Sequence, residues 1–140
     1  MRFIVMVKAN KESEAGRLPT AEELRPMGAF NEQLVKAGVM LAAEGLQPSS
    51  KGVRIKFSGS KPTDTDGPFA ETKELVAGFW LLQVKSREEA IEWIKRAPFK
   101  NNEEVEIRQV FEAEDFGDAL APEMKEYELK LRELAAQNRK

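Results

Sequence analysis

The chain has 140 residues, a formal net charge of -2, and 33% charged against 41% hydrophobic residues. These values indicate a globular domain with a substantial core, and the mixed charges give no reason to expect nucleic acid or a membrane surface as partner. The sequence contains no Cys and no His, which excludes disulfides, thiolate nucleophiles and histidine acid/base chemistry.

The first part of the sequence predicts a strand, a loop and a helix. Phe3 to Val7 is apolar and β-rich, typical of a strand buried on both faces, whereas the polar stretch Asn10 to Leu18 is interpreted as a loop. The strand is too short for a signal-peptide core or a membrane span, so we expect a cytoplasmic protein. Thr20 and Glu23 form a capping box that predicts a helix start, with Pro26 either kinking the first turns or moving the start to about residue 26. The predicted inward stripe of this helix is Leu24, Met27, Phe30 and Leu34.

The middle of the sequence predicts more strands and a second helix. Val53 to Phe57 alternates apolar and polar residues, which predicts a half-exposed strand. Ala77 to Val84 is apolar on both faces, and a second capping box, Ser86 with Glu89, predicts the helix that follows it. The other two predicted strands are Val39 to Ala43 and Val105 to Val110.

This order of elements predicts an α+β domain over residues 1–112, a ferredoxin-like sandwich of β-α-β-β-α-β type with a hairpin insertion. Both helices of such a sandwich cover one face of the sheet, yet two of the predicted strands are apolar on both faces. A second subunit packed on the open face is the most economical cover, so we predict a homodimer. The alternative is a monomer whose second face lines a pocket or is capped by a helix.

Residues 113–140 predict a helical extension. Leucine, methionine and tyrosine side chains recur there at spacings of three and four, which is one helical stripe. The stripe is too short for an independent coiled coil, so we expect this helix to pack on its own subunit or across the dimer. Its members are Leu120, Met124, Tyr127, Leu131 and Leu134.

The segment from Thr65 to Glu74 combines a turn dipeptide, a proline, an aromatic residue and several charges. Asp66 is interpreted either as a general base, substrate anchor or metal ligand, or as part of a tight turn in which Gly67 supplies a positive φ. Residue chemistry alone favours the turn. A calcium loop fails on spacing, because its first and last ligand positions fall on Pro62 and Lys73.

Other charged residues extend this candidate site. Glu71, Lys73 and Glu74 lie close together after the turn, either as acid/base groups or as a solvated charge cluster. Glu44 ends an apolar strand, where its carboxylate faces either a cavity or solvent. Arg54 is a candidate anion ligand, although a sheet-surface role is more common for such a residue. No phosphate-binding loop, nucleophile elbow or dinucleotide fingerprint is present, so we expect no cofactor.

Several of these segments resemble the YCII-related, DGPF-domain family over residues 2–112. The resemblance rests chiefly on Asp66-Gly67-Pro68-Phe69-Ala70-Glu71-Thr72-Lys73-Glu74, together with Glu44-Gly45-Leu46-Gln47-Pro48 and Ala77-Gly78-Phe79-Trp80-Leu81-Leu82. It implies a dimeric α+β barrel and gives Asp66 a role beyond a turn. A His-Asp pair is suspected of catalysis in YCII-type relatives, and this chain has no His.

Two classes of function are consistent with these observations. The first is a small-molecule-binding protein that acts as a cofactor-free enzyme of lyase or isomerase type, with Asp66 as base and Glu44, Glu71 or Lys73 assisting in a dimer cleft. The second is a non-enzymatic ligand-binding or regulatory module associated with transcription, because DGPF proteins resemble proteins encoded beside extracytoplasmic-function sigma factors. A purely structural dimer is a third alternative.

Overall fold

The computed structural model describes residues 1–139, apart from the side chain of Lys73. The chain divides into two compact units, Met1–Gln109 and Val110–Lys140. Within the described residues, no helix is both long enough and apolar enough to cross a lipid bilayer.

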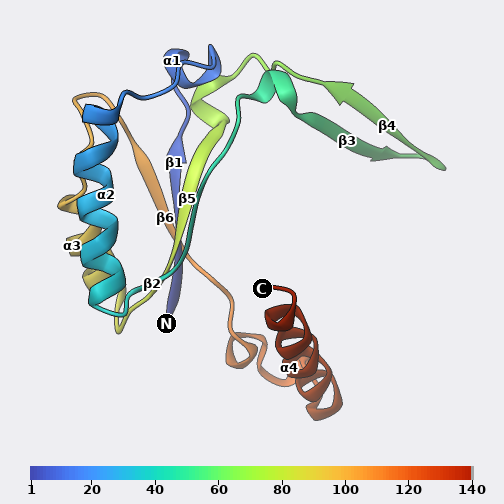
Figure 1. Ribbon diagram of the computed structural model, residues 1–140. Helices are drawn as coiled ribbons and strands as arrows, with labels where there is room; N and C mark the ends of the chain where they lie inside the picture. The colour runs from blue at the N-terminus through green and yellow to red at the C-terminus, as the bar shows by residue number, and fades with distance from the viewer. Residues whose placement is uncertain (140) are drawn as a thin grey trace. The chain divides into compact units, whose positions relative to one another are not determined.

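The first unit has the predicted β-α-β-β-α-β order, with a β-hairpin inserted between its second and third sheet strands (Figure 1). The sheet strands are β1 (Arg2–Lys8), β2 (Met40–Gly45), β5 (Val76–Gln83) and β6 (Val105–Gln109), and the hairpin strands are β3 (Val53–Ser58) and β4 (Lys61–Asp66). The helices are α1 (Lys11–Glu14), α2 (Ala21–Lys36) and α3 (Arg87–Lys95), with short 3-10 turns η1 (Ser49–Lys51) and η2 (Thr72–Glu74).

The four-stranded sheet has the order β2-β5-β1-β6, and every neighbouring pair is antiparallel. This is the split β-α-β arrangement. Strand β5 lies between β1 and β2, which α2 connects, and β1 lies between β5 and β6, which α3 connects. Val5 of β1 lies opposite both Trp80 of β5 and Ile107 of β6. This register places those three side chains on one face of the sheet.

Helices α2 and α3 cover one face of this sheet (Figure 1). The side chains on that face form the core and are almost fully buried, because the apolar stripes of the two helices pack on them. On the opposite face the side chains of β1 and β5 are equally apolar but only half-buried. The buried members are Phe3, Val5, Trp80 and Leu82, and the half-buried ones are Ile4, Met6, Phe79 and Leu81.

Both predicted helix starts are confirmed, although only Thr20 and Glu23 form a reciprocal capping box, since the Glu89 carboxylate accepts from the Lys85 N–H rather than from Ser86. The Thr20 hydroxyl accepts from the Glu23 N–H at 3.2 Å, and Ser86 accepts from the Glu89 N–H at 3.1 Å. The alternative start near Pro26 is wrong, since α2 begins at Ala21 and contains Pro26. Leu24 is wrongly placed in the inward stripe, because its side chain is 54% exposed.

Two other expectations are corrected by the structure. The stretch interpreted as a loop after β1 contains the short helix α1, whose start is held by reciprocal hydrogen bonds between Asn10 and Ser13. Strand β3, predicted to be half exposed, is exposed along its whole length. The reason is that β3 pairs only with β4, and every residue of both strands is exposed, so no layer of the described fold packs on this two-stranded sheet.

The second unit contains a 3-10 segment, η3 (Ala113–Ala119), and the predicted helix, α4 (Pro122–Gln137). Pro122 opens α4, a position where the missing N–H of proline costs no hydrogen bond. The rings of Phe111 and Phe116 pack with centroids 5.1 Å apart. The apolar stripe of α4 remains exposed at Met124, Tyr127, Leu131 and Leu134.

Candidate ligand cavity

A cavity of about 280 Å³ lies between α2 and one end of the four-stranded sheet. Strands β1, β2 and β5 contribute Val7, Ala43 and Trp80 to its wall, α2 contributes Met27, and Phe99 closes it from the segment after α3. Most of the lining is apolar, and Asn31 and Glu44 are the polar residues among the described ones that line it. A lining of this kind, apolar with few polar groups, is typical of small-molecule sites.

Two facing glycines leave the sheet side of this cavity open. Gly45 of β2 and Gly78 of β5 are cross-strand partners, and both line the cavity. Gly78 is required by close approach, since a β-carbon there would lie 2.9 Å from the Glu44 carbonyl oxygen. A β-carbon on Gly45 would meet nothing within 4 Å. The space that a side chain would fill is therefore open at Gly45, whereas at Gly78 the Glu44 carbonyl occupies it.

An aromatic cluster forms the inner wall. Trp80 is only 5% exposed, and its indole meets Phe30 and Phe99 edge to face, with ring centroids 5.9 Å away in both cases. Edge-to-face contacts of this kind add to the stability that burial alone provides. The Trp80 Nε1–H donates a hydrogen bond of 2.8 Å to Oδ1 of Asn31. The wall is therefore held by both packing and a hydrogen bond.

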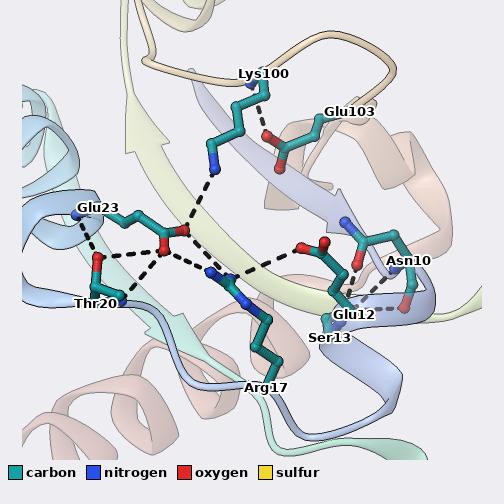
Figure 2. Close-up of polar contacts among 8 residues, drawn as sticks. All are labelled: Asn10, Glu12, Ser13, Arg17, Thr20, Glu23, Lys100 and Glu103. Atoms are coloured by element: carbon teal, nitrogen blue, oxygen red, sulfur yellow. Dashed lines mark hydrogen bonds and ion pairs between the residues drawn. The ribbon is translucent and has the colours of Figure 1, made fainter.

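A larger groove of about 1080 Å³, lined by many polar and charged residues, adjoins the cavity, since Met27 and Phe99 line both. Figure 2 shows the charged cluster in this groove. The Glu23 carboxylate accepts hydrogen bonds from Arg17 Nη2 at 2.7 Å and from Lys100 Nζ at 3.4 Å. The hydrogen bond from Arg17 lowers the pKa of Glu23 to about 2, with smaller contributions from Lys100 and the Thr20 backbone. The cluster joins the start of α2 to the segment before β6.

The Asp-Gly-Pro-Phe loop is fixed by contacts with the segment before β3. Gly67 donates its N–H to the Gly52 carbonyl at 3.0 Å, and Phe69 donates to the Ser49 hydroxyl oxygen at 3.0 Å. A β-carbon on Gly67 would lie 1.7 Å from the Ser49 carbonyl oxygen. The predicted positive-φ turn is wrong, because Gly67 is not among the residues with positive φ. Its glycine is required by the close approach of another backbone segment.

Ser49 also connects this loop to α1. Its hydroxyl donates to the Glu14 carboxylate, and its backbone N–H donates to the same carboxylate at 2.9 Å. Both hydrogen bonds lower the pKa of Glu14, and the one from the Ser49 hydroxyl has the larger effect. The Arg54 guanidinium lies 3.8 Å from the centre of the Phe69 ring, a cation–π contact that joins the loop to β3.

Comparison with known proteins places this architecture in a family. The model of the YCII-related domain matches residues 1–114. The chain belongs to the YCII-related family. An uncharacterized protein of Rhizobium meliloti is 32% identical to this YCII-related chain over 72 residues, which are 51% of this chain and 58% of the relative. The matched region thus spans less than two thirds of that relative's length.

Among solved structures, this YCII-related chain is similar to a dehydrochlorinase. That protein is 5-chloro-2-hydroxyhydroquinone dehydrochlorinase (TftG) from Burkholderia phenoliruptrix, in complex with 2,5-dihydroxybenzoquinone. The identity is 14% and the TM-score is 0.41, and the alignment covers 81% of this chain and 98% of the other. A similarity this distant transfers neither activity nor ligand.

The structure of the YCII-related chain does not gather the candidate residues predicted from sequence into one cavity. Asp66 ends β4 and Glu71 precedes η2; both are exposed, and neither lines the cavity. Glu44 does line it, but its cross-strand partner is Phe79, so its side chain belongs to the open face of the sheet. The side chain of Lys73 lies outside the described part of the structure. In residues 1–139, no group of acidic side chains is arranged to hold a metal ion.

Sequence reasoning missed Asn31, Ser49 and Glu14. Asn31 was detectable in principle, because it follows the buried Phe30 and lies four residues after Met27, so a polar group interrupts an apolar stripe. Ser49 and Glu14 carried no comparable signal. They meet across 35 residues of sequence, and only the folded chain brings them together.

Proposed function

We propose that this YCII-related protein binds a small molecule in the cavity between α2 and the sheet. The observation that carries the proposal is the facing pair Gly45 and Gly78, which line the cavity without side chains and leave open space at position 45. The walls are preformed by the Phe30, Trp80 and Phe99 cluster. A preformed apolar cavity with one fixed amide is suited to binding, because little must be ordered when a ligand enters.

We also propose that the protein acts as a homodimer in which the ferredoxin-like sheets pack face to face as an α+β barrel. Support comes from the open sheet face, where apolar side chains of β1 and β5 stay half-buried. Glu106 and Arg108 lie on the same face, opposite Met6 and Ile4. A two-fold axis allows opposite charges of this kind to pair between identical surfaces.

Cofactor-free catalysis is the second candidate function, and it is supported by the position of Glu44 on the open face of the sheet, which the proposed dimer would enclose. In this proposal Glu44 and Asp66 supply acid/base chemistry, and Glu71 and Lys73 assist them from the dimer cleft. For a compound that binds and is converted, Glu44→Gln and Asp66→Asn should abolish turnover and leave the Kd unchanged. Turnover that survives both substitutions would remove the carboxylates from the mechanism.

The binding proposal is tested by filling the cavity. Toluene is titrated into 15N-labelled protein, and the indole N–H signals of Trp80 and Trp93 are followed. We expect the Trp80 signal to shift and the Trp93 signal, an internal control, to stay in place. Gly45→Val should abolish the shift without loss of stability, because its side chain enters open space and valine is favourable in strands.

Gly28→Ala is the matched control, since a β-carbon at Gly28 also meets nothing within 4 Å but lies outside the cavity lining. This variant should bind toluene as the unmodified protein does. If toluene leaves the Trp80 signal unmoved, or if Gly45→Val still responds, the cavity is not a ligand site.

A further inference from the structure

The side-chain amide of Asn31 has a defined orientation. An indole N–H can only donate, so the atom that receives it at 2.8 Å must be the amide oxygen. The Nδ2 group is left without a hydrogen-bond partner among the described residues. Within the same residues, no buried side-chain nitrogen or oxygen lacks a partner. The two N–H groups of Asn31 are therefore accessible to a molecule in the cavity that it lines.

The charges around the cavity argue against an anionic ligand. No Lys or Arg side chain is among the described residues that line it, and its one ionisable residue is Glu44. An anion entering this apolar space would lose hydration without gaining a cationic partner, which is strongly unfavourable. The Arg17 and Lys100 side chains in the adjoining groove are already paired with Glu23.

The size and walls of the cavity indicate a single ring. An engineered apolar cavity of about 150 Å³ holds benzene, so about 280 Å³ accommodates one ring with a short substituent. Trp80 and Phe99 present aromatic surfaces, and Met27 adds a polarizable thioether. A planar ring makes more contact with such walls than a flexible chain of equal volume, and it loses less conformational entropy on binding.

We propose that Asn31 determines ligand specificity in this cavity: held by Trp80, its Nδ2 group donates to the carbonyl or hydroxyl oxygen of an uncharged, single-ring aromatic molecule. This inference rests on the proposed function, because it names the class of ligand for the same cavity. A fixed donor discriminates between ligands, since a bound ligand without an acceptor leaves its N–H groups unpaired.

The test compares acetophenone with ethylbenzene, which has the same skeleton without the carbonyl oxygen. Both are titrated against the unmodified protein, Asn31→Asp and Gln33→Glu, with the Trp80 indole N–H as the readout. Asn31→Asp keeps an oxygen for the Trp80 N–H and removes the donors. Gln33→Glu makes the same change of charge at an exposed position of α2 outside the lining.

We expect the unmodified protein and Gln33→Glu to bind acetophenone about tenfold more tightly than ethylbenzene, and Asn31→Asp to lose that preference through weaker acetophenone binding. Equal binding of the two compounds by the unmodified protein would overturn the role of Asn31 and leave the cavity as a binding site. If benzoate binds as tightly as acetophenone, the inference that the ligand is uncharged is overturned. If neither neutral compound moves the Trp80 signal, the proposed function itself fails.

Discussion

Gly45 and Gly78 face each other across β2 and β5, yet a β-carbon would be accommodated at the first position and not at the second. Gly78→Ala should lower the free energy of unfolding by about 1–3 kcal/mol, because the methyl group meets the Glu44 carbonyl oxygen. Gly45→Ala should raise it by about 0.5 kcal/mol, because the unfolded chain loses freedom and no contact is strained. Urea unfolding followed by tryptophan fluorescence measures both changes. Equal stability of the two variants would contradict the close approach of the strands.

Ser49 connects the Asp-Gly-Pro-Phe loop to α1 through a single hydroxyl group. Ser49→Ala should speed hydrogen exchange at the Phe69 amide, which loses its acceptor. The pKa of Glu14 should rise towards its usual value, because its strongest hydrogen bond is removed. NMR exchange and carboxyl titration measure these effects. Ser50→Ala, at the exposed neighbouring position, is the control and should change neither.

The Glu23 cluster predicts a defined acid dependence. The carboxylate of Glu23 has a pKa of about 2 in the folded protein, below the usual 4.5, so its interactions stabilise the fold fully above about pH 4.5. This contribution is lost as the pH falls through that range to about 2. Glu23→Gln should therefore lower the Tm at neutral pH, and the difference from the unmodified protein should disappear near pH 2.

The matched control for this titration is Glu32→Gln, which removes the exposed ion pair with Lys36 on the same helix. Such pairs contribute little, so its Tm should follow the unmodified protein at every pH. A difference for Glu23→Gln that stays constant on acidification would show that the cluster does not act through the charge of Glu23.

The proposed dimer places Leu81 near the centre of the interface, beside Ile4 and Ala42. Leu81→Lys should yield monomers in light scattering, because a charge buried between two apolar sheets is unpaired. Phe57→Lys makes a similar change on the hairpin, where the side chain is 80% exposed, and should leave the dimer intact. An unmodified protein that is monomeric at micromolar concentration would contradict the dimer.

Much of the fold was predictable because its signals are local. Thr20 with Glu23 and Ser86 with Glu89 satisfy backbone donors three residues away, so neighbouring residues are enough to begin each helix. The apolar runs of β1 and β5 likewise predicted strands with two apolar faces. The prediction that Leu24 is a core residue was wrong. Helical spacing shows which residues share one side of a helix, but not which turns of that helix pack on the sheet.

The sequence by itself determined the order of strands and helices, and it excluded histidine and thiolate chemistry by containing neither His nor Cys. Only the tertiary structure decided where a molecule could bind. The Trp80–Asn31 hydrogen bond joins residues 49 positions apart, and the Phe69–Ser49 bond joins residues 20 apart. Position 67 requires glycine because the Ser49 backbone approaches it closely, and not because of the conformation of the turn that contains it. Such requirements come from segments that meet only after folding, so no local pattern of residues records them.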